Sequence, residues 1–424
     1  MIKFLAKGLL RDRSRSLFPI ITVIAGTLLT VVMYSWVQGA VSQMFDLSAR
    51  FATGHVKVMT RAYNEISDQI PNDLAILGLK EQLATLRAEY PHMIWFPRIQ
   101  FGGLLDVPGA HGETMSQGPV MGLGLEFGGS DSGAGILNIN KAIVRGRVPQ
   151  GPDEILISEE LAKKLGVKPG QQVTLLGSTM SGSMSIYNFL VSGTMRFGIS
   201  ALDRSMIIAD IRGVQNALDM PDGAGEILGL DRTMIFDEEK TAKIISGFNQ
   251  KYSHKDDEFS PQMISLRDQM GMGALMDMMN VAVSIMVSIF IFVMSLVLWN
   301  AGLIGGLRRF GEIGLRLAIG ESKPALYKSM IAEAVLIGIA GSIGGTLLGL
   351  MFAFYLQEVG FDLSGMLQGS EVILFPDIIR ARVTPGTYYI AFIPGVFASV
   401  LGTMFAGIGV FKRQTAQLFK ELEV

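Results

Sequence analysis

The stretch RRFGEIGLRLAIGESK, residues 308 to 323, carries six charged side chains in sixteen positions. Uncharged runs flank it on both sides, from Met278 to Leu307 and from Ala334 to Gln357. Each run is longer than the roughly 20 apolar residues that a helix needs to span a bilayer. The charged stretch is therefore predicted to be a short loop at one membrane face, between two spanning helices.

Two further uncharged runs, from Leu17 to Val37 and from Tyr388 to Phe411, are also long enough to span a bilayer. About 240 mostly polar residues separate the Leu17–Val37 run from the Met278–Leu307 run. The 424 residues are 49% hydrophobic, with a net charge of −2 and a mean hydropathy of +0.39, which is too apolar for an ordinary soluble protein and too polar for a wholly embedded one. The expected fold is a membrane protein with four transmembrane α-helices and a large domain inserted between helices 1 and 2.

The short flanks of the spans differ in charge. Lysine and arginine are concentrated before the first span, in the 308–323 stretch and at Lys412 and Arg413, whereas residues 358–387 hold four acidic residues against two arginines. Cytoplasmic flanks carry the excess of positive charge, so both termini are predicted to be cytoplasmic and the large domain external. The first span is interpreted as a retained anchor, because the flank SWVQGAVSQM lacks a persuasive small-x-small cleavage site.

The inserted domain is predicted to be α+β, with two subdomains. The strand EILIS precedes a helix with Ser158 as its N-cap and Gly166 as its stop, and further strands follow. Residues 102–135 are rich in glycine and serine and are expected to form a looser segment or a subdomain boundary. The absence of cysteine excludes disulfides, thiolate metal sites and lipidation at cysteine. The four histidines are scattered without metal-ligand spacing, so no metal site is expected.

The chain can be divided on this basis. The expected segments are a cytoplasmic amphipathic helix at 1–16, transmembrane helix 1 with its stalk at 17–44, the external domain at 45–270, a stalk with transmembrane helix 2 at 271–307, a cytoplasmic loop or helix at 308–325, transmembrane helix 3 at 326–357, an external loop at 358–387, transmembrane helix 4 at 388–411 and a cytoplasmic tail at 412–424.

This order of segments, the EILIS-helix-LGVKPG region and the loop RRFGEIGLRLAIG resemble the FtsX-like permease family of type VII ABC transporters. The loop is similar to the family pattern basic-basic-x-x-Glu-Ile-Gly-x-Arg-x-Ala-x-Gly, and Glu333-Ala334-Val335 is similar to the start of the family's third span. The family includes the macrolide exporter permease and the lipoprotein-releasing permeases. The chain departs from it after the fourth span, where GVFKRQTAQLFKEL lacks the two prolines that members often have.

Two interpretations of the charged loop remain open. In the first interpretation, its basic residues set the membrane topology and meet anionic lipid headgroups, and they have no further role. The resemblance implies instead a coupling helix seated on a separate ATPase subunit, with its apolar residues at helical spacing. The candidate coupling residues are Arg308, Arg309, Glu312, Ile313, Arg316 and Leu317. No G-x-x-x-x-G-K-[ST] segment is present, so the chain is expected not to be an enzyme and to hold no cofactor, with ATP and Mg in the partner subunit.

Several residues are candidates for a substrate cavity between the first two spans, open to the outer leaflet. They are Trp36, Val37, Val41, Met44 and Phe45 from the first helix and Met272, Met276 and Met279 from the second. Methionine adapts to acyl chains of varying shape, although a packed stalk helix would use the same residues. In the third span Gly341, Gly345 and Gly349 are predicted to pack against the fourth span, with a dimer contact as the alternative. Glu333 is expected to pair with Lys328 or a loop arginine.

Three classes of function are compatible with these features. The predicted one, which the resemblance to the lipoprotein-releasing permeases implies, is a permease that takes a lipoprotein or other lipid-linked substrate from the outer leaflet of the bacterial inner membrane and passes it to a periplasmic carrier. The others are a tripartite-efflux permease for drugs or peptides and a regulator of a periplasmic partner. The resemblance implies an ATP-binding cassette ATPase, a second copy of the chain or a related permease, and membrane lipids as partners, and no nucleic acid.

Overall fold

The computed structural model describes residues 13–109, 112–198, 200–269, 271–307, 310–362 and 378–412. These residues fall into two compact units. The first, here called the helical unit, lies within Met1–Gln43, Asp277–Asp362 and Ile378–Val424. The second, here called the sheet unit, lies within Met44–Met276. The predicted amphipathic helix at 1–16 lies outside the described residues except for its last turn.

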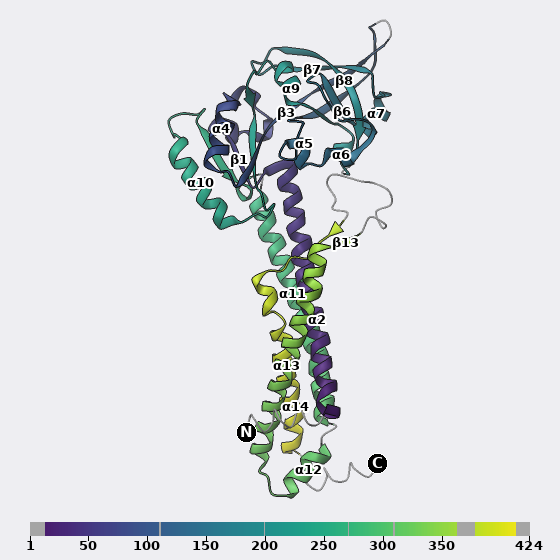
Figure 1. The fold of residues 1–424 in the computed structure, drawn as a ribbon, viewed down its shortest axis with the longest axis vertical. Coiled ribbons are helices and arrows are strands. Elements are labelled where there is room, and N and C mark those ends of the chain that lie inside the picture. Colours follow the sequence, from purple (N-terminus) through teal and green to yellow (C-terminus); the bar gives the residue numbers. More distant parts are fainter. Residues whose placement is uncertain are drawn as a thin grey trace. The chain divides into compact units, whose positions relative to one another are not determined.

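Long helices build the helical unit (Figure 1). They are α2 (Arg13–Ser48), α11 (Met272–Leu307), α13 (Lys323–Glu358) and α14 (Ser399–Lys412), with a 3-10 turn (Pro385–Tyr388) and a π-helical turn (Ile393–Ala398) before α14. Among the described residues, four segments are long and apolar enough to cross a membrane: Leu17–Thr53, Met272–Asn300, Lys323–Glu358 and Pro385–Gly407. The prediction of four spans is therefore confirmed. The first helix continues to Ser48, well beyond the predicted end of the span at Val37.

Glycines bring the helices of this unit close together. A Cβ atom on Gly345 would lie 1.8 Å from Thr27 Oγ1, and one on Gly341 would lie 2.5 Å from Val23 Cγ1. A Cβ on Gly349 would lie 2.7 Å from Val31 Cβ. All three partners are on α2, so the expected packing of this glycine row against the fourth span is wrong. Helix α13 meets the fourth span instead at Gly338 and Ser342. A Cβ on Gly338 would lie 2.9 Å from Val396 Cα, and one on Gly395 would lie 2.1 Å from Ser342 Oγ.

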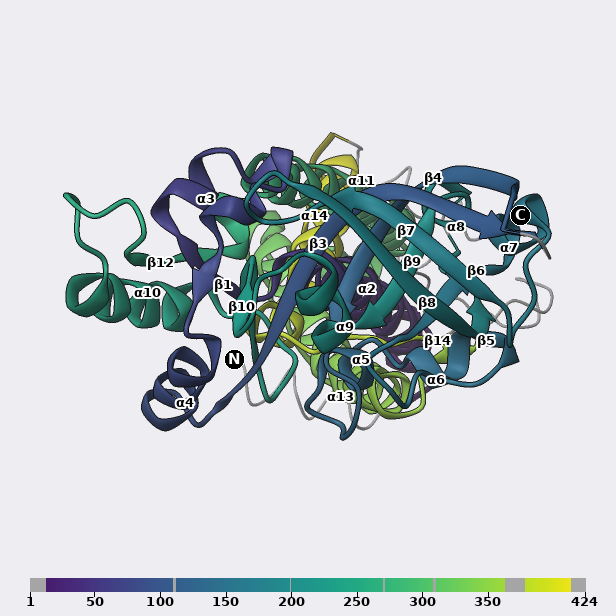
Figure 2. The same ribbon diagram turned by 90° about the horizontal axis from the view of Figure 1, so that it is seen from above.

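The sheet unit contains a ten-stranded mixed sheet, shown from above in Figure 2. Its order is β12-β1-β11-β3-β4-β9-β6-β8-β5, and β7 pairs with β3 and β8. The strands are β1 (Val56–Thr60), β3 (Met93–Pro108), β4 (Thr114–Leu125), β5 (Ile143–Gly146), β6 (Glu154–Ser158), β7 (Gln172–Ser178), β8 (Met184–Met195), β9 (Met206–Asp210), β11 (Glu226–Asp231) and β12 (Pro261–Ser265). Two short strands, β2 (Ile76–Leu77) and β10 (Gly223–Ala224), pair separately.

Helices cover this sheet and help to enclose its core. The longer ones are α4 (Leu79–Glu89), α7 (Glu159–Leu165), α9 (Ile211–Ala217) and α10 (Glu238–Tyr252), and the shorter ones are α3 (Arg61–Glu65), α5 (Gly133–Ile136), α6 (Ile139–Ala142) and α8 (Ser200–Asp203). Helix α7 begins as the sequence predicts, because Ser158 Oγ accepts the N–H of Leu161 at 3.2 Å. It ends at Gly166, whose φ of 72° is left-handed. Trp95, Phe101 and Phe248 lie in one large apolar cluster that runs under most of the sheet.

The predicted loose segment at 102–135 is wrong for most of its length. Residues 102–108 and 114–125 belong to β3 and β4, which pair antiparallel as the longest ladder of the sheet. Gly122 is a packing position, since a Cβ there would lie 2.0 Å from the ring of Phe101. This glycine therefore marks close packing under an aromatic ring and not a flexible excursion.

Candidate functional site

The charged loop at residues 308–323 contains a short helix, α12 (Phe310–Ala318). Gly320, with a φ of 101°, turns the chain after α12. Arg316 donates from Nε to Glu321 Oε2 at 2.7 Å and from its second nitrogen to Oε1 at 3.0 Å. The pair is partly exposed and closes the turn between α12 and α13, so the loop holds a fixed shape at this point.

Two apolar side chains of the loop face solvent. Leu315 is 55% exposed and Ile319 is 78% exposed, and they are four residues apart. Large apolar side chains next to an arginine, on a helix ending at a tight turn, suit a groove in another protein. Of the predicted coupling residues, Leu317 is half-buried, Arg308 and Arg309 lie outside the described residues, and Glu312 and Ile313 lie on α12 without described side chains.

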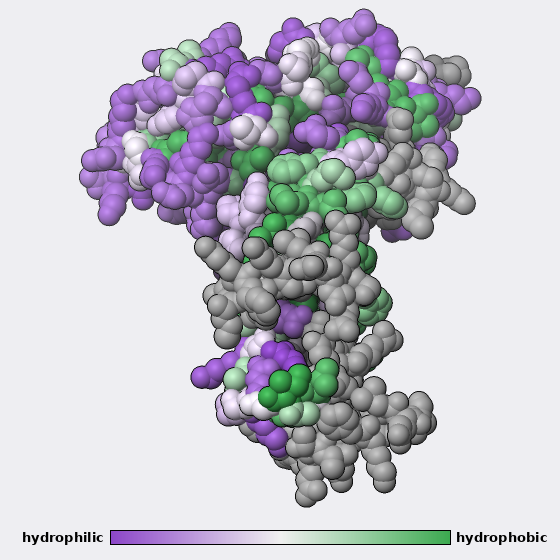
Figure 3. All heavy atoms as spheres, turned by 60° about the horizontal axis from the view of Figure 1, so that its bottom comes forward, coloured by the Kyte–Doolittle hydropathy of each residue, from purple (hydrophilic) through white to green (hydrophobic). Residues whose placement is uncertain are grey.

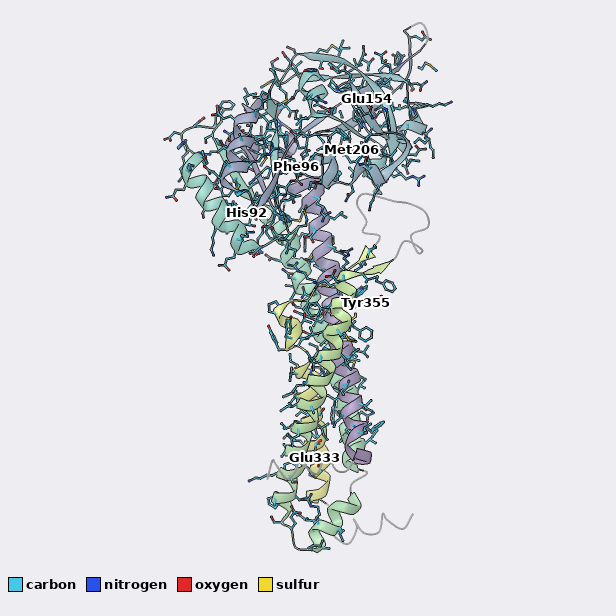
Figure 4. The ribbon with its side chains drawn as sticks, in the orientation of Figure 1. His92, Phe96, Glu154, Met206, Glu333 and Tyr355 are labelled. Carbon is cyan, nitrogen blue, oxygen red and sulfur yellow. The ribbon has the colours of Figure 1, made fainter. Side chains whose placement is uncertain are left out.

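The sequence also singles out Glu333, on α13. It is half-buried and lies in the part of α13 nearer α12, whereas the exposed Tyr355 lies toward the opposite end of the helix (Figure 4). Its expected pairing with Lys328 or a loop arginine stays a prediction.

The predicted substrate-cavity residues differ in their exposure. Val37, Phe45 and Met276 are buried, Met44 is 51% exposed, and Trp36, Val41, Met272 and Met279 are half-buried. Within the helical unit Val37 lines a cavity between α2 and α11 with Thr30, Met33, Tyr34, Met286, Val287 and Phe290. Its volume of about 10 Å³ is no larger than the space that one water needs. In this conformation the two helices are in contact at that level and leave no room for an acyl chain.

Sequence reasoning missed a more open surface on α11. Asn280, Ser284 and Ser288 lie four residues apart, and with Val281, Ile285 and Ile289 they line a shallow hollow of about 420 Å³ on the outside of the helix. Ser284 satisfies its hydroxyl within the helix by donating to the Asn280 carbonyl oxygen at 2.7 Å. The sequence contains the signal, because Asn280, Ser284 and Ser288 are three polar residues at helical spacing inside an apolar run. The prediction rested on the neighbouring methionines instead.

The surface of the sheet unit in Figure 3 is largely hydrophilic, with smaller hydrophobic areas. Among the described residues, no group of three or more His, Cys, Asp or Glu side chains could hold a metal ion. The surface of the sheet unit is therefore that of a water-exposed domain.

Four spanning helices, a short amphipathic helix between the second and third, and one large water-exposed domain after the first define a class of membrane permease. Comparison with known families agrees. Residues 16–233 match the MacB-like periplasmic core domain, and residues 284–415 match the FtsX-like permease C-terminal region. The first match covers more than half of the chain, so the chain belongs to the MacB-like family of FtsX-type ABC transporter permeases.

One solved structure, the crystal structure of the periplasmic region of MacB from Actinobacillus actinomycetemcomitans, is similar at 12% identity and a TM-score of 0.34. The similarity covers 55% of this chain and 95% of that one. A comparison with curated proteins found no match. Permeases of this family work with ABC ATPase subunits and usually dimerise, and the large domain is periplasmic.

Proposed function

We propose that this chain is the permease subunit that transmits ATPase-driven motion to its periplasmic domain and extracts a lipoprotein or other lipid-linked substrate from the outer leaflet of the bacterial inner membrane. The substrate then passes to a periplasmic carrier. Both termini lie in the cytoplasm, and ATP with Mg is bound and hydrolysed in the partner subunit.

The observation that carries this proposal is α12 with its closing turn. The helix joins the second and third spans directly, so any displacement of α12 acts on the covalent ends of two membrane helices. Its exposed Leu315 and Ile319 provide an apolar docking ridge, and the Arg316–Glu321 pair stiffens the turn behind it.

Support for a lipid-linked substrate comes from the helices on the outer side. Met44 is exposed on α2, and the outside of α11 is apolar apart from its stripe of Asn280, Ser284 and Ser288. A surface that is apolar, contains flexible methionine and carries small polar groups suits an acyl chain with a polar linkage. The tight contact around Val37 means that α2 and α11 must separate before a chain can lie between them, which is the step that ATP would drive.

The test is photo-crosslinking in proteoliposomes that contain the chain, its ATPase and a triacylated test lipoprotein. A photoreactive residue at the exposed Met44 is expected to capture the lipoprotein before ATP is added and to lose it afterwards, with Val41 and Met272 behaving alike. The buried Met276 serves as a matched control on the same stretch as Met272. Capture of a soluble drug with no capture of the lipoprotein would favour the efflux alternative and reject this proposal.

A further inference from the structure

The first membrane helix does not end in a simple cap. After Ser48 the chain widens into a π-helical turn, Ala49–Thr53, in which the N–H of Gly54 donates to the carbonyl oxygen of Ala49 at 2.7 Å. Gly54 has a φ of 64°, and a Cβ there would lie 2.4 Å from the Val56 carbonyl oxygen. A helix that stops this way leaves its last carbonyl groups without partners inside the helix. They need donors from elsewhere.

The donors come from two distant parts of the sheet unit. Arg98, on β3, donates from its two terminal nitrogens to the carbonyl oxygens of Phe51 and Ala52, each at 2.6 Å. Gln269, just before α11, donates to the carbonyl oxygen of Thr53 at 3.0 Å. Three successive carbonyl groups of the π-helical turn that follows α2 are therefore bonded to a central strand and to the segment that leads into the second membrane helix.

Arg98 is itself held in place by a buried carboxylate. Its Nε donates to Glu226 Oε2 at 2.9 Å, while Lys57 Nζ and Gln100 Nε2 donate to Oε1 at 2.9 Å and 3.2 Å. Lys57, Arg98 and Glu226 are 6%, 3% and 2% exposed. Burial alone would raise the pKa of Glu226, but the charges of Arg98 and Lys57 lower it to about 2, so the carboxylate is ionised.

Stability is a weak reason for such a cluster. Buried ion groups lose their hydration, and apolar replacements of similar volume are often as stable or more stable. What the cluster supplies is a fixed orientation of the Arg98 guanidinium. The planar guanidinium has donors on several sides, so it can bind one carboxylate and two carbonyl groups at once, which an ammonium group cannot do. A positive group at the C-terminal end of a helix also interacts favourably with the helix dipole.

We propose that Arg98, oriented by Glu226, is a positioning residue that fixes the end of the first membrane helix to the central strand β3. Gln269 fixes the same end to the segment before α11. Movement of the helix end is then passed to the sheet and is not absorbed by bending of the π-helical turn. This last step rests on the proposed function, whereas the fixed attachment itself does not.

The attachment can be measured in the full chain in nanodiscs without ATP. The native sequence has no cysteine, so spin labels can be placed at two introduced ones, replacing Met44 on α2 and the exposed Lys243 on α10. Wild-type protein is expected to give a narrow distance distribution. Arg98→Met and Glu226→Gln should broaden it about twofold and accelerate hydrogen exchange of residues 49–55 at least tenfold. Arg98→Lys should give an intermediate width.

Two control variants separate attachment from stability. Arg87 also donates to a carbonyl oxygen, that of Trp95, but does not touch α2, so Arg87→Met should keep the wild-type width. Leu86→Ala removes a buried core side chain and should lower the melting temperature while leaving the width unchanged. If Arg98→Met and Glu226→Gln keep the wild-type width and exchange, the attachment is overturned, whatever the chain transports.

A second measurement of the distance between the two labels, with the ATPase added, tests the positioning role. In wild type and in Leu86→Ala the distance should stay the same with and without nucleotide, because the helix end and the sheet move together. Arg98→Lys is expected to keep basal ATP hydrolysis but to show a nucleotide-driven change in this distance, because the π-helical turn then bends and absorbs the movement. Equal nucleotide-driven changes in Arg98→Lys and wild type would overturn the positioning role. Absence of lipoprotein capture in the photo-crosslinking test would reject the proposed function but would leave the attachment result intact.

Discussion

Helix α2 is held in two places by opposite means. Along its membrane-spanning part, Val23, Thr27 and Val31 lie against the bare backbone of three glycines on α13. At its end, the carbonyl groups of the last turn are bonded by a buried arginine that depends on a buried glutamate.

The difference follows from the two solvents. Between helices in lipid there is little hydrophobic gain and charges are costly, so close packing of small residues supplies the attraction. In the water-exposed domain the core excludes water only locally, and a cluster of charges is tolerated where every charge is paired and bonded. The glycine contact allows one helix to slide or tilt on another, whereas the charge cluster fixes a single geometry.

The largest expected effect comes from removing one charge of the cluster. Glu226→Ala leaves Arg98 and Lys57 buried without a counter-charge and should destabilise the sheet unit by about 3–5 kcal/mol. Chemical unfolding of the full chain in detergent measures this, followed by tryptophan fluorescence in a background where Trp36→Phe and Trp299→Phe leave the buried Trp95 as the reporter. The matched triple variant Lys57→Met, Arg98→Met, Glu226→Leu should recover most of the loss. A Glu226→Ala effect below about 1 kcal/mol would contradict the account of the cluster as three interdependent charges.

The glycine contact should respond to volume and not to charge. Gly345→Ala places a methyl group 1.8 Å from Thr27 Oγ1 and 2.7 Å from a carbonyl oxygen of α2, which should cost about 1–3 kcal/mol through overpacking. Gly344 is the matched control, because its Cβ would meet only the flexible side chain of Ile24 at 3.2 Å. Thermal unfolding in nanodiscs should separate the two variants. Equal melting temperatures would mean that the α2–α13 contact is looser than the structure shows.

The domain end of α2 should also respond to pH through His55. Its Nδ1 accepts the N–H of Asp231 at 3.0 Å, and burial lowers its pKa from 6.5 to about 4; Asp231 opposes this shift, while Arg50 and Lys240 add to it. Because the folded pKa is below the unfolded one, His55 contributes stability above pH 6.5 that is lost as the pH falls toward 4. Between pH 7 and pH 5 the loss should be about 2 kcal/mol.

The control for this pH effect is His55→Asn, whose side-chain oxygen can accept the same N–H without titrating. Unfolding curves of both proteins at pH 7 and pH 5 give the comparison. If His55→Asn loses as much stability as the wild type over this range, other groups cause the pH dependence and the interpretation of His55 fails.

The sequence predicted the features that depend on residues close together in the chain. Uncharged runs revealed the four spans, and Ser158 with Gly166 marked the two ends of α7, because length and capping depend on neighbouring residues. The partner of the glycine row was missed, since one helix face does not say which helix will fill it. Lys57, Arg98 and Glu226 were missed because they are far apart in the sequence and each looks like an ordinary surface charge. Their role exists only after β1, β3 and β11 have become neighbours.

The smallest effect on stability is expected at the partly exposed ion pair of the loop between α11 and α13, which makes it the sharpest contrast to the buried cluster. Breaking the Arg316–Glu321 pair by Arg316→Ala should cost under about 1 kcal/mol, because both groups are partly solvated.

Yet Arg316→Ala and Glu312→Ala are expected to reduce substrate-stimulated ATP hydrolysis of the reconstituted complex several-fold, since both residues fit the family loop. The swap Arg316→Glu with Glu321→Arg restores a pair across the turn but not a cation at position 316. Stimulation should therefore stay low in the swap if Arg316 contacts the ATPase. Full recovery would show that the pair only shapes the loop, and unchanged stimulation in both alanine variants with intact assembly would leave the loop a topology signal alone.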